Sequence, residues 1–409
     1  MRRQPTFKNV TRRDPSLGKI IALLLFLFAV VYGGLWITET LRGHYFVGSW
    51  ESKAHAAIED ARQLMEEQRS AEVRELLAPI VARVSDSRIT PEALFLLAKA
   101  EQAAGNVEQA ETYLKRAISE FPNSPHHPKA ALACARLLEE NGDMEQALAL
   151  YDEVRDTAAP EFRAEALTAF GRQAEREGEL WEARDYYAKA LEDAEWNSEA
   201  WGEALDGLGE ANVELIFSSR ETPESRYYEV QSGDNLTKIG VELNTTQGLL
   251  MRANNMEDPS NLRVGQRLKH TPKDFRIVIE RSTRRLFLLD NDGIFKRYEV
   301  GLGRPGQETV LGSYRVGNKQ KDPAWFKPGH GVIPANDPRN ELATRWMPMV
   351  PEEEGLPTDL GIHGTIAPET IGEYDSNGCV RMYTEEVEEL YDLVVRATPV
   401  EVVEVFSPA

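Results

Sequence analysis

Cysteine is scarce in this chain, whose 409 residues include only Cys134 and Cys379. Two cysteines allow one disulfide at most, and 245 residues separate this pair, so we expect both thiols to be free. In PKAALACARLLEENG, Cys134 shares one helical face with alanine and leucine side chains, which predicts a buried position. Cys379 instead follows Ser-Asn-Gly, sixteen residues after His363, and a free thiol there is better explained by chemistry than by packing.

Positive charge is also scarce beyond the N-terminus. The net charge at pH 7 is −20, although residues 1–19 carry six basic side chains and a single acidic one. The rest of the chain therefore totals −25, which is −20 minus the +5 of this tail. Proteins that bind nucleic acids use Lys and Arg side chains to displace counterions from the phosphates. Because the chain after residue 19 is strongly acidic, we expect no nucleic-acid partner.

Two kinds of hydrolytic site are absent from the sequence. No His-Glu-x-x-His occurs, and His126-His127 lies in a proline-rich stretch between predicted helices, so a metallopeptidase is not supported. A glycosidase needs two positioned carboxylates, and none of the 67 acidic residues is singled out by its context. We therefore expect neither a metal nor another cofactor.

One long apolar run is present, the nineteen uncharged residues IIALLLFLFAVVYGGLWIT at 20–38. About twenty such residues span a bilayer as a helix. Because basic flanks stay in the cytoplasm, the tail at 1–19 predicts that everything after the run is exported to the periplasm or cell-wall space. A cleaved signal peptide is the alternative, but its apolar region would be shorter, with a small-residue cleavage site close behind. We expect a single-pass anchor in the cytoplasmic (inner) membrane.

Residues 50–217 are rich in helix-forming residues and contain a repeat. GNVEQAETYLKRAI, GDMEQALALYDEV and GELWEARDYYAKAL begin at Gly105, Gly142 and Gly178, which are 37 and 36 residues apart. Each has an alanine five residues after its glycine, a pattern that resembles the tetratricopeptide repeat and implies an α-helical solenoid. The region is predicted to be either a spacer or a docking groove for a protein partner, and residues 201–215 to form a truncated capping helix.

A polar linker at 218–225 precedes residues 227–270, whose pattern predicts a small βααβ unit. Val-x-x-Gly-Asp-x-Leu, Ala-Asn-Asn and Leu-x-Val-Gly-Gln-x-Leu occur there in order, as in the LysM module that this stretch resembles. The resemblance implies binding of N-acetylglucosamine-containing glycan strands of peptidoglycan. Asp234 is also expected to cap the first helix. The family's glycan groove maps onto Gly233, Asp234, Asn235, Leu236, Asn261, Leu262 and Arg263.

Residues 275–406 alternate apolar and polar side chains as strands do, and Asp-Asn-Asp-Gly marks a hairpin turn. Only residues 385–397 have a helical pattern, and VEVVEVF at 400–406 predicts a last strand, so this region should be mostly β. The segment 319–358 is predicted to be either a lid over a site or a solvated loop.

Cys379 and His363 have the residue types of a nucleophile and its base. A thiol with a pKa near 8.5 is mostly neutral at pH 7, so it needs a base or a cation to become a thiolate. His363 lies in Gly-Ile-His-Gly-Thr, and an imidazole titrates near neutrality. Gly378 would leave nearby backbone N–H groups unobstructed for an oxyanion. His330 is the second candidate base.

His363-Gly364 followed by Ser376-Asn377-Gly378-Cys379-Val380-Arg381 resembles the motif of the L,D-transpeptidase (YkuD-like) catalytic domain, a β-rich sandwich. VGLGRPGQETVLGSYRV at 300–316 and TRWMPM at 344–349 add to the resemblance. Two departures are Asn377, which replaces a second histidine and cannot titrate, and Thr309-Val310-Leu311-Gly312 in place of Thr-Pro-x-Gly. The fold class is then a multidomain α plus β chain with an N-terminal transmembrane helix, a helical solenoid, a LysM module and a mostly-β sandwich.

This resemblance also implies roles for the individual residues. Cys379 is the nucleophile, His363 the base, the Gly364 carbonyl orients the imidazole, and the Gly378 and Cys379 amides form the oxyanion hole. Ser376, Asn377 and Arg381 are expected to contact substrate, with fixing of the turn as the other role for Arg381.

The implied reaction is ping-pong acyl transfer on peptidoglycan. Cys379 attacks the third residue of a tetrapeptide stem, the terminal D-alanine leaves and a thioester remains. An amine of a neighbouring stem then makes a crosslink, whereas water would make the protein an L,D-carboxypeptidase, and the sequence leaves this choice open. A non-enzymatic peptidoglycan-binding scaffold is the third possibility, for which Cys379 and His363 would not be needed together.

Overall fold

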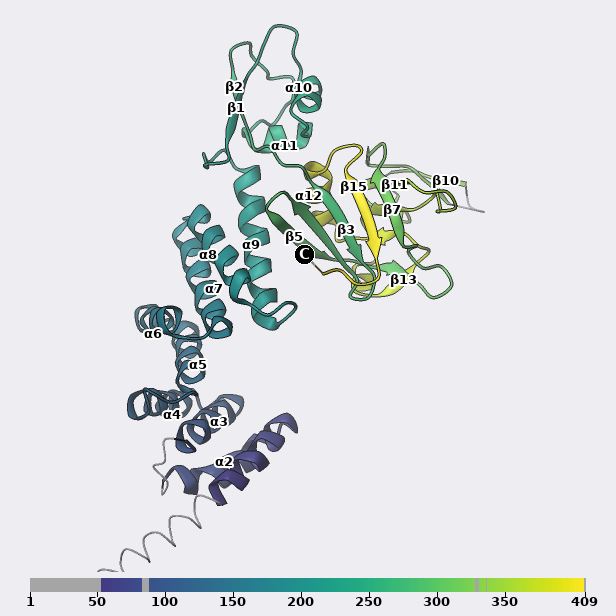
Figure 1. Cartoon of the computed structure of the whole chain (residues 1–409). Coiled ribbons are helices and arrows are strands. Elements are labelled where there is room, and N and C mark those ends of the chain that lie inside the picture. The colour runs from purple at the N-terminus through teal and green to yellow at the C-terminus, as the bar shows by residue number, and fades with distance from the viewer. Residues whose placement is uncertain (1–52, 83–87, 328–330, 336, 408–409) are drawn as a thin grey trace, which may run out of the picture. The chain divides into compact units, whose positions relative to one another are not determined.

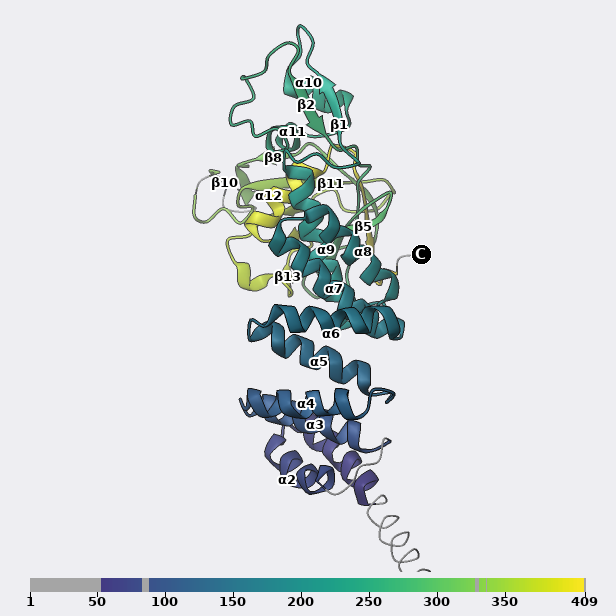
Figure 2. The same cartoon turned by 90° about the vertical axis from the view of Figure 1, so that its left-hand side faces the viewer.

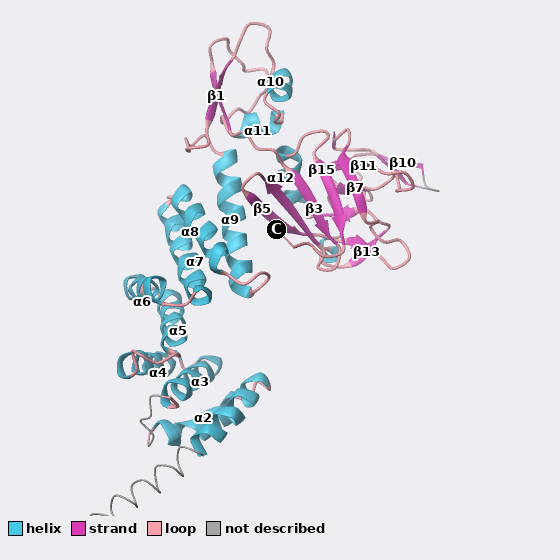
Figure 3. Ribbon diagram, viewed as in Figure 1, coloured by secondary structure: helices cyan, strands magenta, loops and turns pink. Residues whose placement is uncertain are grey.

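The computed structural model describes residues 53–82, 88–327, 331–335 and 337–407. It has two compact units, which divide between Ala147 and Leu148, inside the predicted helical region 50–217. Helices make up most of the described chain before residue 218, and most strands follow residue 275 (Figures 1 and 3). The predicted basic tail and the membrane anchor at 20–38 lie outside the described residues. Within the described ranges, no helix is both long enough and apolar enough to span a bilayer.

Residues 53–66 are helical and precede the named helices. The helices are α2 (Ser70–Val81), α3 (Thr90–Ala103), α4 (Val107–Glu120), α5 (His127–Glu140), α6 (Met144–Thr157), α7 (Pro160–Glu177), α8 (Leu180–Asp193), α9 (Glu199–Phe217), α10 (Leu236–Glu242), α11 (Gln247–Arg252) and α12 (Thr384–Leu393). The strands are β1 (Arg226–Glu229), β2 (Arg267–His270), β3 (Arg276–Glu280), β4 (Arg285–Asp290), β5 (Gly293–Glu299), β6 (Leu302–Gly303), β7 (Gly312–Val316), β8 (Gln320–Lys321), β9 (Trp325–Lys327), β10 (Gly331–Ile333), β11 (Arg345–Pro351), β12 (Gly361–His363), β13 (Tyr374–Ser376), β14 (Val380–Arg381) and β15 (Pro399–Val403).

The repeat glycines lie just after α3, α5 and α7. Gly105, Gly142 and Gly178 have φ of +78°, +83° and +81°, in the left-handed region that a glycine enters without a Cβ clash. The alanines five residues later are fully buried, as the repeat pattern predicts. Cys134 is buried in α5 as predicted, its burial raises its pKa to about 11, and both cysteines are free thiols.

Residues 201–215 lie within α9, which the sequence predicted to be a truncated cap. The helix extends beyond this range at both ends: α9 has 19 residues, and the Ser198 hydroxyl caps it by accepting a hydrogen bond from the Trp201 N–H. Its length follows from burial on two sides, against α8 and against strand β5 (Figures 1 and 2).

Helix α9 ties the last repeat to the sheet of the C-terminal region. Leu205 and Leu208 share one apolar core with Phe287 and Leu289 of β4. The Asn212 amide also donates to the Phe295 carbonyl at 2.9 Å. Strand β5 lies at the edge of its sheet, so its outer backbone N–H and C=O groups have no strand partner. Helix α9 covers this edge and so protects these backbone groups from pairing with another chain.

Residues 227–270 fold as the predicted strand, helix, helix and strand, with β1 and β2 antiparallel. A small core of Val230, Leu236, Ile239, Leu250 and Leu268 holds the unit together. The predicted cap at Asp234 is wrong by one residue. Asn235 accepts the Lys238 N–H at 2.9 Å, because the Asp234 carboxylate is already engaged by the Gln231 N–H and the Tyr228 hydroxyl.

The C-terminal region is mostly β, as predicted. Nine strands form one sheet in the order β14-β12-β11-β7-β15-β3-β4-β5, with β8 beside β11. The predicted hairpin joins β4 to β5, and the last strand is β15. The predicted helix at 385–397 is observed as α12, whose Val387, Leu390 and Leu393 enter the main core beneath the sheet.

The segment 319–358 contains strands β8 to β11 and is therefore more than a loop. In the β9–β10 pair, Phe326 lies opposite Val332, and both side chains are largely exposed. The second candidate base, His330, lies outside the described residues.

Candidate active site

Cys379 and His363 lie on neighbouring strands. Strands β12 and β14 are parallel, with His363 opposite Arg381, and the same register places Gly361 opposite Cys379. Side chains two residues apart share a face, so the imidazole, the sulfur and the Arg381 side chain all lie on one face of the sheet. A strand spacing of about 4.8 Å and two residues of rise put the Cα atoms of Cys379 and His363 roughly 8 Å apart.

The His363 imidazole is held in one tautomer. Its Nδ1 lies 2.6 Å from the Gly364 carbonyl oxygen, which only accepts hydrogen bonds, so Nδ1 carries the proton and Nε2 keeps a lone pair. The side chain is buried, and this burial lowers its pKa to about 4. At neutral pH the imidazole is therefore neutral and able to accept a proton at Nε2. The sequence named this carbonyl as the group that orients the ring.

Trp346 is a neighbour of His363 for which the sequence predicted no role. It lies opposite His363 on β11, and the two ring centroids are 5.8 Å apart. The indole also covers Gly361, leaving no room there for a Cβ atom. Trp346 lies in TRWMPM, a stretch that resembles the L,D-transpeptidase catalytic domain, and this resemblance was the one sequence feature that pointed to it.

The Cys379 side chain is partly exposed. Its sulfur lies 3.9 Å from the Asp359 carbonyl oxygen, and burial raises the pKa of the thiol above its usual value. In the described part of the chain no hydrogen bond joins the sulfur to the imidazole. The resting pair is therefore a neutral thiol and a neutral imidazole, because desolvation disfavours both charged forms.

Ser376 holds the turn that carries Cys379. Its buried hydroxyl donates to the Cys379 carbonyl at 2.6 Å and accepts the Gly378 N–H at 3.2 Å. The structure thus uses this hydroxyl inside the turn, where the sequence expected a contact with substrate. Gly378 has φ of +108°, a conformation that favours glycine.

This engagement changes the expected oxyanion hole. The Gly378 N–H already has an acceptor in Ser376, so it is not free for a substrate oxygen. Over the described ranges, the Cys379 N–H has no acceptor within hydrogen-bond distance. Of the two predicted donors, only the Cys379 amide is available in this conformation.

Thr309 links the turn to the rest of the domain and was not predicted to do so. Its fully buried hydroxyl donates to the Gly378 carbonyl at 2.9 Å and accepts the Gly303 N–H at 3.0 Å. In the sequence, Thr309 was noted only as the first residue of Thr309-Val310-Leu311-Gly312, which departs from the family's Thr-Pro-x-Gly. The threonine is common to both stretches, and its side chain is the one that contacts the turn.

Arg381 and Asn377, which lie on either side of Cys379, differ in their contacts. The Arg381 guanidinium lies 3.0 Å from the Asp375 carboxylate and 3.8 Å from Glu341, and its side chain is mostly buried. These contacts match the turn-fixing role. Asn377 is exposed, and its amide makes no hydrogen bond to the described residues.

The two loops of the LysM unit onto which the glycan groove was mapped lie side by side. Backbone hydrogen bonds between Val230 and residues 265–266 hold the loop after β1 beside the loop before β2. Asn235, Asn261 and Arg263 are exposed there, whereas Leu236 is buried in the small core and is not open to a sugar.

Three family models match this chain. Residues 274–402 match the L,D-transpeptidase catalytic domain, residues 228–270 the LysM domain, and residues 18–208 a tetratricopeptide repeat-like domain. The three resemblances predicted from the sequence are thereby confirmed. The chain joins an L,D-transpeptidase catalytic domain to a LysM domain and to tetratricopeptide-like helices.

Relatives with curated names agree with these matches. A Bacillus licheniformis protein that carries the name L,D-transpeptidase YkuD is 25% identical over 181 residues, 43% of this chain and 97% of its own length. YqjB of Bacillus subtilis, also named as an L,D-transpeptidase, is 29% identical over 130 residues, 32% of this chain and 71% of its own. A crystal structure of an L,D-transpeptidase from Mycobacterium tuberculosis is 19% identical with a TM-score of 0.27, covering 34% of this chain and 63% of that one.

Proposed function

We propose that this protein is a membrane-anchored peptidoglycan L,D-transpeptidase. Cys379 forms a thioester with the third residue of a tetrapeptide stem and passes the acyl group to an amine on another stem. The observation that carries this proposal is the neutral His363 imidazole, held by the Gly364 carbonyl with Nε2 unprotonated, on the strand next to Cys379.

The first half-reaction begins from the neutral pair. As the sulfur attacks the stem carbonyl, the thiol proton passes to Nε2 of His363 and the carbonyl electrons move to oxygen. The Cys379 N–H is the donor placed to stabilise that oxyanion. The carbon–nitrogen bond then breaks, and the proton returns from Nε2 to the leaving D-alanine amine. The product is a thioester on Cys379.

Burial destabilises the protonated form of His363, so its positive charge in the proposed reaction is short-lived. A site that lowers the imidazole pKa to about 4 disfavours the imidazolium, so the proton is readily passed to the leaving amine. In the second half-reaction, the acceptor amine attacks the thioester, Nε2 takes a proton from it, and the thiol is restored. A water molecule in place of the amine would make the same site an L,D-carboxypeptidase.

The other domains support the location and the substrate. The LysM domain would bind glycan strands and so raise the local concentration of stems near Cys379. The apolar run at 20–38 would anchor the chain in the cytoplasmic membrane and leave the catalytic domain outside the cytoplasm. The helices of 50–217 would serve as a spacer or bind a protein partner.

Mass spectrometry of the full-length protein tests the acyl-enzyme directly. With a tetrapeptide stem or a carbapenem we expect one adduct on Cys379, lost in Cys379→Ala and slowed at least about a hundredfold in His363→Ala. Cys134→Ala is the matched control and should leave the adduct unchanged, since that thiol is buried in α5. If Cys379 is not modified, the result would refute the transpeptidase proposal and favour a non-enzymatic peptidoglycan-binding scaffold. Adding a stem amine and identifying the crosslink or the free tripeptide separates transpeptidase from carboxypeptidase.

A further inference from the structure

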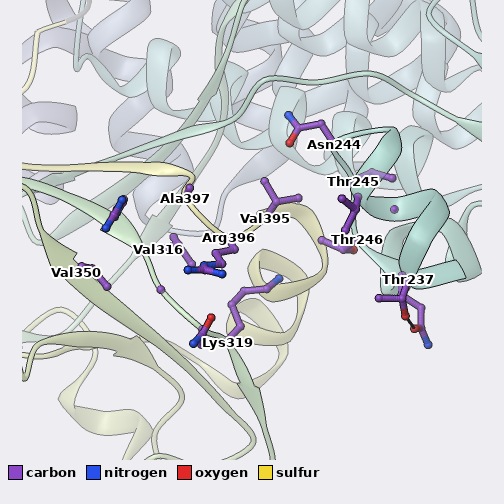
Figure 4. A pocket seen from close by; sticks show the side chains of 16 residues that line it. Thr237, Asn244, Thr245, Thr246, Val316, Lys319, Val350, Val395, Arg396 and Ala397 are labelled. Atoms are coloured by element: carbon purple, nitrogen blue, oxygen red, sulfur yellow. Dashed lines mark hydrogen bonds between the residues drawn. The ribbon is translucent and has the colours of Figure 1, made fainter.

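A cleft of about 800 Å³ lies between the LysM domain and the catalytic domain, inside the compact unit that begins at Leu148 (Figure 4). Thr237, Asn244 and Thr246 line it from the LysM side. Lys319 and Arg396 line it from the catalytic side. The two loops of the predicted glycan groove do not line this cleft, so it is a separate site.

The two walls are fixed to each other. The Thr246 hydroxyl donates to the Asp392 carbonyl at the end of α12, and the Arg252 guanidinium lies 3.6 Å from the Asp392 carboxylate. Gly248 packs so closely on Asp392 that a Cβ atom would have no space. These contacts join the LysM domain to the end of α12 beside the cleft.

The charge of the cleft contrasts with the rest of the chain. The protein has 67 acidic residues, yet no acidic side chain is among those that line the cleft. Arg315 and Arg396 line it, are exposed, and make no ion pair with the described residues. Lys319 is different, because its ammonium donates to the Tyr391 and Val394 carbonyls at 2.5 Å and its burial lowers its pKa to about 8. The two arginines are thus the cations open to a ligand.

Part of the cleft wall lies on the same face of the sheet as Cys379, because Arg315 and Val350 are on that face, whereas Val316 belongs to the core on the other face. A row of neighbours runs from Cys379 to Gly361 on β12, to Pro348 on β11, and to Gly317 at the edge of the cleft. A Cβ on Gly317 would meet the Pro348 and Val350 side chains, so these residues share that face. Three strand spacings separate the Cys379 backbone from the Gly317 backbone, about 14 Å.

This distance can be compared with the length of a stem. Three extended residues span about 10 Å, so a stem whose third carbonyl lies at Cys379 ends about 4 Å short of Gly317, and the sugar that follows the stem reaches the margin of the cleft. The glycan strand would then run through the cleft. Its next stem would place carboxylates beside the two unpaired arginines.

We propose that the cleft binds an acidic segment of the peptidoglycan strand, namely the sugars and a second stem next to the one that reacts. Arg315 and Arg396 pair with the carboxylates of that second stem, and the polar LysM wall with its exposed Val241 contacts the sugars. The inference rests on the proposed function and adds a subsite that selects polymeric over free stems.

The test measures affinity in the full-length chain carrying Cys379→Ala, which prevents turnover. The ligand is a tetrasaccharide with two tetrapeptide stems, and chitotetraose is the neutral ligand of equal length. Exposed charge pairs contribute roughly threefold each, so Arg315→Gln with Arg396→Gln should weaken binding of the two-stem ligand about tenfold. Chitotetraose affinity should stay the same. Arg285→Gln with Arg339→Gln removes equal charge elsewhere and should change neither affinity.

Two results would overturn the proposal. One is an unchanged affinity of the Arg315 and Arg396 double variant for the two-stem ligand. The other is an equal loss for chitotetraose, which would mean that the arginines only maintain the fold. Thioester formation from a free tetrapeptide, measured with Cys379 intact, is the separate readout. We expect it to be the same in the double variant, and its absence in the parent would refute the transpeptidase reaction while leaving the binding result intact.

Discussion

Replacing Thr309 by valine removes one hydroxyl and leaves two backbone groups of the candidate active site without a partner. The side chain is fully buried, so water does not replace the hydroxyl. The Gly303 N–H loses its acceptor and the Gly378 carbonyl loses its donor. Valine has nearly the same shape as threonine, so no cavity contributes to the effect.

The cost follows from those two groups. A buried backbone group left unsatisfied costs about 1–3 kcal/mol, so Thr309→Val should lower the free energy of unfolding by about 3 kcal/mol. The lost bond to Gly378 also loosens the turn that carries Cys379. A displacement of about 1 Å at a nucleophile reduces rates by up to a hundredfold, so acylation should slow about ten- to a hundredfold.

Two measurements check this expectation. Urea unfolding followed by tryptophan fluorescence gives the stability, and the rate of carbapenem acylation at Cys379 gives the effect on the site. Thr309→Ser keeps the hydroxyl and should recover most of the acylation rate. Thr112→Val is the control, because the Thr112 hydroxyl donates to the Glu108 carbonyl on an exposed helix face. A Thr309→Val protein within about 0.5 kcal/mol of wild type, acylated at the normal rate, would refute the reasoning.

Three further expectations concern the candidate active site and the LysM domain. Acylation of Cys379 should persist far below pH 6.5 and decline only near pH 4, because His363 with a pKa of about 4 stays neutral over that range. Acylation rates measured from pH 3.5 to 8 check this, and a decline in rate centred near pH 6.5 would contradict it. The same lowered pKa means that the unfolded chain binds a proton between pH 6.5 and 4 while the folded chain does not, so stability falls by about 3 kcal/mol as pH drops through that window. His363→Gln should remove this slope in urea midpoints measured against pH, and an unchanged slope would assign it to other groups. Asn261→Ala with Arg263→Ala should weaken binding of neutral chitooligosaccharides by calorimetry and leave acylation unchanged, whereas equal loss of both would indicate a folding defect.

A neutral resting pair has a consequence for selectivity. A thiol whose pKa is raised reacts slowly with adventitious electrophiles, because the thiolate is the nucleophilic form. In the proposed reaction, transfer of the proton to His363 accompanies attack on a bound carbonyl. On that proposal the site becomes reactive when a stem occupies it, which would protect the thiol in the oxidising compartment that the sequence predicts.

The contact between α9 and β5 changes the expected role of the helices. The sequence presented the repeats as a spacer or a docking surface separate from the catalytic domain. In the structure, Arg297 of β5 bonds to the Asp206 carboxylate at 2.7 Å, and Lys296 lies 2.9 Å from Glu210. Helix α9 therefore packs as part of the catalytic domain, and its removal would expose an apolar face of the sheet.

The sequence by itself determined the features that depend on neighbours along the chain. The turn glycines at 105, 142 and 178, the buried alanines after them, and the strand-helix-helix-strand order of the LysM unit all follow from local spacing. The residue types around Cys379 and His363 predicted the proposed chemistry for the same reason. Local conformation and periodic burial are encoded within a few residues, so a pattern is sufficient to predict them.

Only the tertiary structure decided which polar groups of the candidate active site have hydrogen-bond partners within the protein and which remain open to a substrate. Ser376 occupies the Gly378 N–H, and Thr309 reaches the turn from 69 residues away. Burial by distant strands sets the protonation of His363 and Cys379, and the docking of two domains creates the cleft with Arg315. Hydrogen-bond partners and desolvation depend on pairing between distant segments, and the spacing of residues along the chain does not specify that pairing.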